Sequence, residues 1–288
     1  MKLGVIFPQT EIGADPAVLR EYVQTVEGLG YDYLTVYDHV LGANPDRPGG
    51  WSGPYTYLTQ FHEPMVLFGW MAAMTQHLEF VTGVIILPQR QTALVAKQAA
   101  ELSVLSGGRF RLGVGVGWNI VEYEGLGQDF HTRGKRVEEQ VKLLRELWAK
   151  PLVNFEGNFD RIPDAGLNPL PIYPIPIWFG GDADVALRRS AQLGDGWMPN
   201  SMSLAELRVR LDTLRTYLAE AGRDPQGYGI DFRISVSRTP QSNWASDAAQ
   251  LAEMGVTHVA INTMGMGYKN LQEHLAAVKN FKTILTNG

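Results

Sequence analysis

One short segment, residues 79–119, constrains the fold more than any other part of the chain. A β-branched strand comes first, an amphipathic helix that ends in Ser-Gly-Gly follows, and a second strand ends in Gly113, Gly115 and Gly117. This order predicts one parallel βαβ unit. In a barrel of such units the chemistry lies at the carboxyl ends of the strands. Glycine at a strand end removes the side chain that would hold a flat ligand away, so a planar ligand is expected there.

Strand and helix patterns alternate along the whole chain. Strands are predicted at 3–8, 33–37, 79–86, 109–116, 176–180, 195–199, 229–236 and 257–262. Helices are predicted at 16–29, 64–76, 92–105, 132–149, 184–193, 203–221, 245–254 and 270–284. Eight strand and helix pairs predict an α/β fold, a single (β/α)8 TIM barrel over residues 1–288. A doubly wound open sheet is the alternative.

Two segments are longer than connections require, and both are rich in Pro, Gly and aromatic residues. Segment 41–62 follows the second predicted strand, so in a barrel it lies on the active face. Segment 151–175 precedes the fifth strand, on the opposite face, where a role in packing or subunit contact is expected.

Composition excludes several classes of function. The net charge of −5 and the dispersed charges disfavour nucleic acid or an anionic membrane as the partner. The absence of cysteine excludes disulfides, thiolate metal sites and cysteine nucleophiles. The longest apolar stretch, 64–74, is too short to span a bilayer, and residue 1 leads into a strand without the order of a secretory signal. A cytoplasmic location is expected.

The candidate acid and base follow the second strand. Asp38 and His39 break the alternation of that strand at its carboxyl end. A histidine there can move a proton at neutral pH, and a neighbouring carboxylate can fix its tautomer. The structural alternative is that Asp38 caps a turn and His39 satisfies loop carbonyls. Position at a strand end favours the catalytic interpretation.

Glycines mark three further places. Gly83, inside an apolar strand next to Val84, indicates a bulge or a close approach by a ligand, and a crowded barrel core is an equal alternative. The LGVGVG series before Trp118 lies within a strand and not in the turn that opens a helix, so it is a poor dinucleotide fingerprint. Gly180 and Gly181 precede a helix, whose start can bind a phosphate.

Two acids qualify the phosphate hypothesis. Asp182 and Asp184 can be helix caps or first-turn acids, and their charge would oppose a phosphate placed too near. No metal site is predicted, because His62, Glu63 and His77 lack the spacing of a known ligand pattern.

Several ordered motifs together resemble one family. They are LGVIFPQ, YDH, TGVIILPQRQTALVAKQAAELSVLSGGRFRLGVGVGWN and IWFGGDADVALRRSAQLGDGWMP. The combination, which extends from residue 1 to about 200, resembles the luciferase-like flavin and deazaflavin oxidoreductases. The branch it most resembles uses coenzyme F-420, an 8-hydroxy-5-deazaflavin.

The resemblance implies roles for individual residues. The bond from Gly83 to Val84 would be a non-prolyl cis peptide in a bulge that supports the deazaflavin ring. Asp38 and His39 would correspond to the family's Asp-His pair, with Asp38 also at the cofactor and His39 near the reacting carbon as a proton donor or transition-state stabiliser. Val116, Gly117 and Trp118 would line the cofactor, and the turn of Gly180 and Gly181 would hold its phosphate. Relatives are often dimers, so a homodimer is expected.

One position departs from the family pattern. Sugar-phosphate dehydrogenases of this group have an acidic glutamate where this chain has Trp118. The change puts a sugar-phosphate substrate in doubt and favours an apolar or aromatic one. The resulting hypothesis is hydride transfer between F-420 and a small organic substrate. The alternatives are an FMN-dependent monooxygenase that uses reduced flavin and oxygen, and a non-catalytic flavin-binding protein. A barrel aldolase or isomerase ranks last, because no lysine stands at a predicted strand end.

Overall fold

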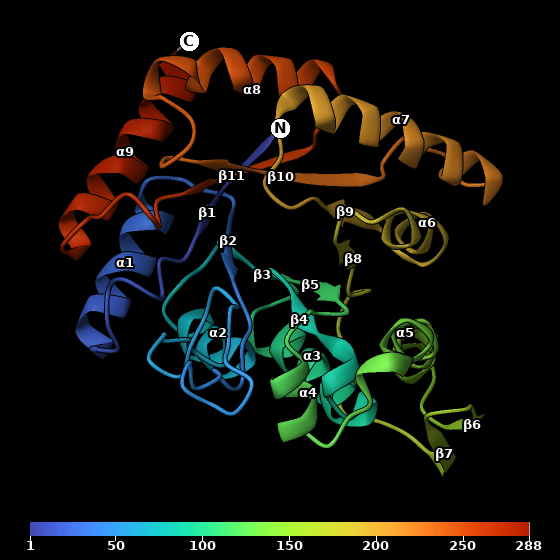
Figure 1. The fold of residues 1–288 in the computed structure, drawn as a ribbon. Coiled ribbons are helices and arrows are strands. Elements are labelled where there is room, and N and C mark those ends of the chain that lie inside the picture. The colour runs from blue at the N-terminus through green and yellow to red at the C-terminus, as the bar shows by residue number, and fades with distance from the viewer. Residues whose placement is uncertain (288) are drawn as a thin grey trace.

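The computed structural model describes residues 1–287, in which parallel strands close into a barrel surrounded by helices (Figure 1). The barrel strands are β1 (Lys2–Ile6), β2 (Tyr33–Val36), β3 (Glu79–Thr82), β4 (Ile85–Ile86), β5 (Phe110–Gly115), β8 (Ile177–Gly180), β9 (Gly196–Met198), β10 (Gly229–Ser235) and β11 (His258–Asn262). Strands β3 and β4 are two parts of one barrel strand and both pair with β5, so the nine strands of the sheet occupy eight positions in the barrel. Pairing of β3 with β5 closes the circle. The predicted TIM barrel is confirmed, and the open-sheet alternative is wrong.

The helices follow the strands in the predicted order. They are α1 (Pro16–Gly28), α2 (Pro64–Ala72), α3 (Thr92–Leu105), α4 (Ile120–Gly125), α5 (Arg133–Ala149), α6 (Asp184–Leu193), α7 (Leu204–Glu220), α8 (Trp244–Glu253) and α9 (Leu271–Asn287). Short 3-10 turns lie at Leu87–Gln89, Phe130–Thr132 and Gln241–Asn243. Helix α4 was not predicted, and α2 ends four residues earlier than predicted. Within residues 1–287, no helix is long and apolar enough to cross a membrane.

The interior of the barrel is filled by side chains below the carboxyl ends of its strands. The guanidinium of Arg111 lies 4.0 Å from the ring centroid of Trp178 and 4.9 Å from that of Tyr33. Glycines make space for these rings: a Cβ on Gly229 would lie 1.9 Å from Trp178, and one on Gly4 would lie 2.3 Å from Tyr33. Small residues opposite large ones give a filled barrel interior, and not a pore.

The first insertion lies where it was predicted, over the carboxyl ends of the strands. An isolated bridge pairs Ala43 with Thr56 and folds the segment back on itself. The indole N–H of Trp51 donates to the carbonyl of Tyr55 at 2.8 Å, and Tyr55 lines the barrel mouth. This insertion therefore contributes aromatic side chains to the active face.

The second insertion contains an antiparallel hairpin, β6 (Val153–Glu156) and β7 (Arg161–Ala165), which lies beside α5 (Figure 1). The prediction that this segment stays on the opposite face is only partly right. The hairpin turn returns along α5, where Glu139 accepts three backbone N–H groups of residues 158–160. Asp160 then accepts a hydrogen bond from Thr92 at the start of α3, on the carboxyl-end side.

Candidate active site

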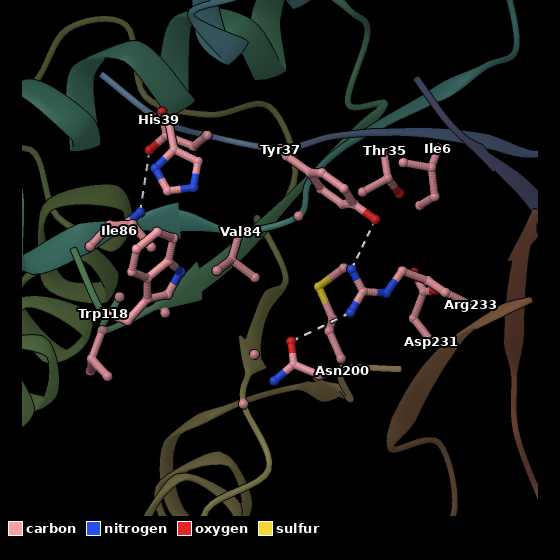
Figure 2. A pocket seen from close by; sticks show the side chains of 18 of the residues that line it. Ile6, Thr35, Tyr37, His39, Val84, Ile86, Trp118, Asn200, Asp231 and Arg233 are labelled. Atoms are coloured by element: carbon pink, nitrogen blue, oxygen red, sulfur yellow. Dashed lines mark hydrogen bonds between the residues drawn. The ribbon is translucent and has the colours of Figure 1, made fainter. Parts of the chain in front are cut away.

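A cavity of about 330 Å³ opens at the carboxyl ends of the strands (Figure 2). All nine predicted residues line it: Asp38, His39, Gly83, Val84, Val116, Gly117, Trp118, Gly180 and Gly181. They come from four of the barrel positions and meet because parallel strands end on the same side. The predicted acid and base, the bulge and the glycine turn therefore surround one space.

The bulge presents Val84 to the middle of this cavity (Figure 2). The strand stops at Thr82 and resumes at Ile85, and the peptide bond between Gly83 and Val84 is cis, as the resemblance predicts. A Cβ on residue 83 would lie 2.3 Å from Cγ2 of Thr35. Because Thr35 on the neighbouring strand β2 fills this space, only glycine fits at position 83.

Glycines on two other strands make room for the side chain of Val84. A Cβ on Gly115 would lie 2.6 Å from Cγ2 of Val84, and one on Gly180 would lie 2.9 Å from Cγ1. Gly117, at φ +67°, leaves room for Ile86 in the same way. The glycine series was predicted to admit a flat ligand directly. It also admits the valine on which such a ligand could rest.

His39 is enclosed by aromatic rings. Its ring centroid lies 4.8 Å from that of Phe61, 4.9 Å from that of Tyr55 and 5.6 Å from that of Trp118. Phe61 and Tyr55 belong to the first insertion. These rings limit the access of water to the imidazole and fix its plane.

A glutamate that was not predicted holds the other side of the imidazole. Oε2 of Glu122 lies 3.3 Å from Nδ1 of His39, and Oε1 accepts the backbone N–H groups of Val40 and Leu41. Burial raises the pKa of Glu122, but the hydrogen bonds from His39 and the two backbone groups outweigh it and lower that pKa. Because a carboxylate only accepts hydrogen bonds, Nδ1 of His39 carries the donated proton and Nε2 is left for the cavity.

Asp38 is not the carboxylate partner of His39. Its Oδ1 accepts from Arg90 at 2.8 Å, and its Oδ2 accepts the backbone N–H of Ile86 at 3.3 Å. Burial raises the pKa of Asp38 in spite of the nearby Arg90. Arg90 also pairs with Glu63 at 3.0 Å. Asp38 thus fixes β4 after the bulge, while Glu122 takes the role predicted for the neighbour of the histidine.

Trp118 forms the outer wall of the cavity. Its indole is 45% exposed and stacks on Trp51 at a centroid distance of 5.8 Å and an angle of 28°. The wall therefore joins the end of β5 to the first insertion.

The glycine turn after β8 opens helix α6 without a side-chain cap. Gly181 has φ +111°, and Ala183 is the N-cap residue. Asp182 accepts the backbone N–H of Asn200 at 2.9 Å, and Asp184 accepts from Tyr217 at 2.6 Å. Neither acid is the N-cap, so backbone N–H groups in the first turn of α6 are left to bind an anion. The negative charge of Asp184 in the same turn opposes that binding.

A polar corner lies across the cavity from Trp118, and sequence reasoning missed it. It consists of Thr35, Tyr37, Asn200 and Arg233, all of which line the cavity. Arg233 donates to the hydroxyl of Tyr37 at 2.9 Å (Figure 2), and it donates to the carbonyl of Pro199 at 3.1 Å. The hydroxyl of Thr35 is buried and has no partner within residues 1–287.

Two sequence signals could have found the missed residues. Asn119 caps α4 by accepting the N–H groups of Val121 and Glu122, and an Asn three residues before a Glu is a helix-start pattern. Arg233 is a charged residue within an apolar strand, which is unusual unless it faces a partner or a ligand. Across residues 1–287, no group of three or more His, Cys, Asp or Glu side chains is arranged to hold a metal ion.

The sequence profile of the family described as luciferase-like monooxygenase matches residues 1–283. The chain belongs to this family. Among its relatives, an uncharacterised protein of Mycobacterium tuberculosis is 33% identical over 286 residues, which cover 96% of each chain. A glucose-6-phosphate dehydrogenase of Segniliparus rotundus that depends on coenzyme F-420 is 31% identical over 235 residues, which cover 78% of this chain and 66% of that protein.

The barrel of this luciferase-like protein is also similar to a solved structure. A secondary alcohol dehydrogenase that depends on F-420, in complex with an F-420–acetone adduct, superposes with a TM-score of 0.80. The superposition covers 99% of this chain and 98% of that chain at 18% identity. This likeness shows the fold.

Proposed function

We propose that the protein is an oxidoreductase that binds coenzyme F-420 and transfers a hydride between it and a small organic substrate. One observation carries the proposal: Val84, placed by the bulge and seated between Gly115 and Gly180, offers an apolar support in the cavity that His39 also lines. Family membership and the F-420-dependent relative support the choice of cofactor.

The residues present fit this cofactor. The cavity contains a flat apolar surface at Val84, Val116 and Gly117, as a planar ring requires. The uncapped start of α6 at Gly180 and Gly181 suits a phosphate. The unpartnered hydroxyl of Thr35 and the donors of the polar corner suit the ring's polar edge. Asp38, which was also predicted to lie at the cofactor, lines the same cavity.

When bound, the deazaflavin supplies the hydride donor or acceptor, and the chain supplies position and a proton. Nε2 of His39 holds or receives that proton at the cavity side. Glu122 acts through His39: it orients the imidazole and stabilises its protonated form. We infer that His39 is the catalytic residue and Glu122 a positioning residue.

The aromatic wall supports an apolar or aromatic substrate. Tyr55, Phe61 and Trp118 pack around His39, and Trp51 stacks on Trp118. Such rings bury apolar surface and exclude water. The chain has Trp118 where sugar-phosphate dehydrogenases of this group have a glutamate, but Glu122 supplies a carboxylate to the site through its contact with His39. This speaks against the non-catalytic alternative.

An equilibrium titration of the purified protein with F-420 and with FMN, side by side, tests the cofactor. We expect F-420 to bind more tightly. Preference for FMN, together with oxygen consumption during turnover, would establish the monooxygenase alternative instead. Replacement of His39 by Ala should abolish turnover and leave F-420 binding intact. Unchanged turnover would refute the role of His39.

We also propose that the protein forms homodimers in the cytoplasm. Val66 on α2 and Leu94 on α3 are exposed apolar residues on neighbouring helices, and the chain has no cysteine. Light scattering on the purified protein measures the mass in solution, and a monomer at micromolar concentration would contradict the dimer.

A further inference from the structure

Arg233 differs from two other arginines that the barrel largely shields from water, Arg90 and Arg111. Arg90 pairs with Asp38 and Glu63, and Arg111 pairs with Glu79 and Asp231. Arg233 makes no salt bridge with any carboxylate in the described part of the chain; its partners are a hydroxyl, a carbonyl and an amide oxygen. A guanidinium taken largely out of water without a carboxylate is costly unless an anion completes its environment.

The two carboxylates that influence Arg233 electrostatically, Asp231 and Asp182, are occupied elsewhere. Asp231 accepts the hydroxyl proton of Tyr33 at 2.7 Å and pairs with Arg111 at 3.4 Å. Asp182 accepts the backbone N–H of Asn200. Burial lowers the pKa of Arg233, but Tyr37, Asp231 and Asp182 together raise it by more, so the guanidinium is charged. Asp231 lines the same cavity, but each of its two carboxylate oxygens already has a partner, in Tyr33 and Arg111.

The polar corner adjoins the bulge. A Cβ on Gly83 would lie 2.3 Å from Thr35 and 3.4 Å from the ring of Tyr37. Arg233 binds the hydroxyl of that same tyrosine, and Figure 2 shows Tyr37 and Arg233 on the side of Val84 away from Trp118. A planar ring that rests on Val84 therefore presents one edge to Arg233 and Tyr37.

We propose that Arg233 and Tyr37 form an oxyanion seat for the edge of the bound deazaflavin ring and hold that ring in its ionised form. The inference rests on the proposed function, since it concerns the same cofactor. An 8-hydroxy-deazaflavin is a phenol conjugated to an electron-poor ring system, so its anion spreads negative charge to the ring edges. The hydroxyl oxygen of Tyr37 accepts from Arg233 and keeps its own proton to donate. Two donors, one of them charged, thus converge on an anionic oxygen.

A small carboxylate substrate would offer the same chemistry to the corner. The position of the corner against Gly83 favours the ring, because the ring rests on the bulge. The experiment therefore separates a ring anion from a substrate anion.

The test is a spectrophotometric pH titration of oxidised F-420 bound to the wild type and to Arg233→Gln, Arg233→Lys and Tyr37→Phe. Ionisation of the phenol changes the visible absorption, so the ring reports its own pKa without turnover. We expect the pKa of the ring in the wild type to lie roughly one to three units below that of free F-420. Arg233→Gln should return it to the free value, while Arg233→Lys should keep part of the shift and Tyr37→Phe should lose part of it. Arg161→Gln, on the exposed hairpin, is the matched control and should titrate as the wild type does.

The remaining outcomes distinguish a failure of the proposed function from a failure of the oxyanion seat. A wild type that does not bind F-420 refutes the proposed function. A wild type that binds F-420 but titrates like the free coenzyme, or an Arg233→Gln protein that titrates like the wild type, refutes only the oxyanion seat. If benzoate binds the F-420-loaded wild type but not loaded Arg233→Gln, while the two rings titrate alike, the anion is the substrate's and the proposal is overturned. If Arg233→Gln does not fold, Arg233→Lys and Tyr37→Phe decide.

Discussion

Replacement of Glu122 by Gln should invert the tautomer of His39 while leaving the site almost unchanged in shape. The amide oxygen can still accept the N–H groups of Val40 and Leu41. The amide NH2 would then face Nδ1, which carries a proton in the wild type. Nδ1 must become the acceptor, so the proton moves to Nε2 and the imidazole can no longer receive one from the cavity side.

The structure bounds the size of the effect. A hydrogen bond to a charged group contributes about 1.5 to 3 kcal/mol. An ion pair at the observed 3.3 Å between His39 and Glu122 corresponds to at most about 5 kcal/mol at an effective dielectric constant near 20. Since about 1.4 kcal/mol changes a rate tenfold, kcat for a step that protonates His39 should fall between about tenfold and a few thousandfold.

Nitrogen-15 NMR of the imidazoles measures the tautomer directly, and kcat with any substrate found by screening measures the rate. The chain has six histidines, so comparison with His39→Ala assigns the signal. Glu124→Gln is the control, because Glu124 lies on the same short helix with a side chain that is 65% exposed. A Glu122→Gln protein that keeps the proton on Nδ1, or keeps the wild-type kcat, would refute the reasoning.

Three further predictions concern stability, measured as the free energy of unfolding in urea. Gly115→Ala should cost roughly 1 to 3 kcal/mol by crowding Val84, and the added change Val84→Ala should restore most of it; additive losses would contradict the packing argument. Arg90→Met should cost about 3 to 5 kcal/mol by leaving Asp38 buried and unpaired, and Asp38→Asn in the same chain should recover part; no recovery would disprove the pairing. The pKa of Glu122 is lowered in the folded protein, so its contribution should be complete above the unfolded pKa of about 4.3 and disappear on acidification below it. A difference between wild type and Glu122→Gln that stays constant down to pH 2 would contradict that lowered pKa.

The order of elements could be predicted from the sequence because the barrel repeats one simple pattern. Alternating β-branched strands and amphipathic helices carry the signal in every unit, and the helix predicted to start at residue 16 does start there, with Asp15 as its N-cap. The bulge was predictable for the same reason: Gly83 interrupts an apolar strand, and the chain divides there into β3 and β4.

The contacts that arrange the site could not be predicted in the same way. Helix α4 has six residues, too few for periodicity to reveal, so the partnership of Glu122 with His39 stayed hidden. Asp38 stands next to His39 in sequence, yet its side chain turns to Arg90, which lies 52 residues further along the chain. Adjacency in sequence was a poor guide to contact, because consecutive residues leaving a strand point in different directions.

The role of the glycines illustrates a second limit. Gly115 and Gly180 lie on different strands, and each is explained by the same side chain, Val84. A sequence shows that a position lacks a side chain, but only the packing across strands shows which neighbour occupies the space.

An experimental structure of the protein with oxidised F-420 bound is the measurement that tests the central claim most directly. We predict that the ring rests on Val84 with its reacting edge toward Nε2 of His39, and that the phosphate lies at the start of α6 beside Gly180 and Gly181. A ring bound away from the bulge, or a phosphate held elsewhere in the chain, would contradict the account.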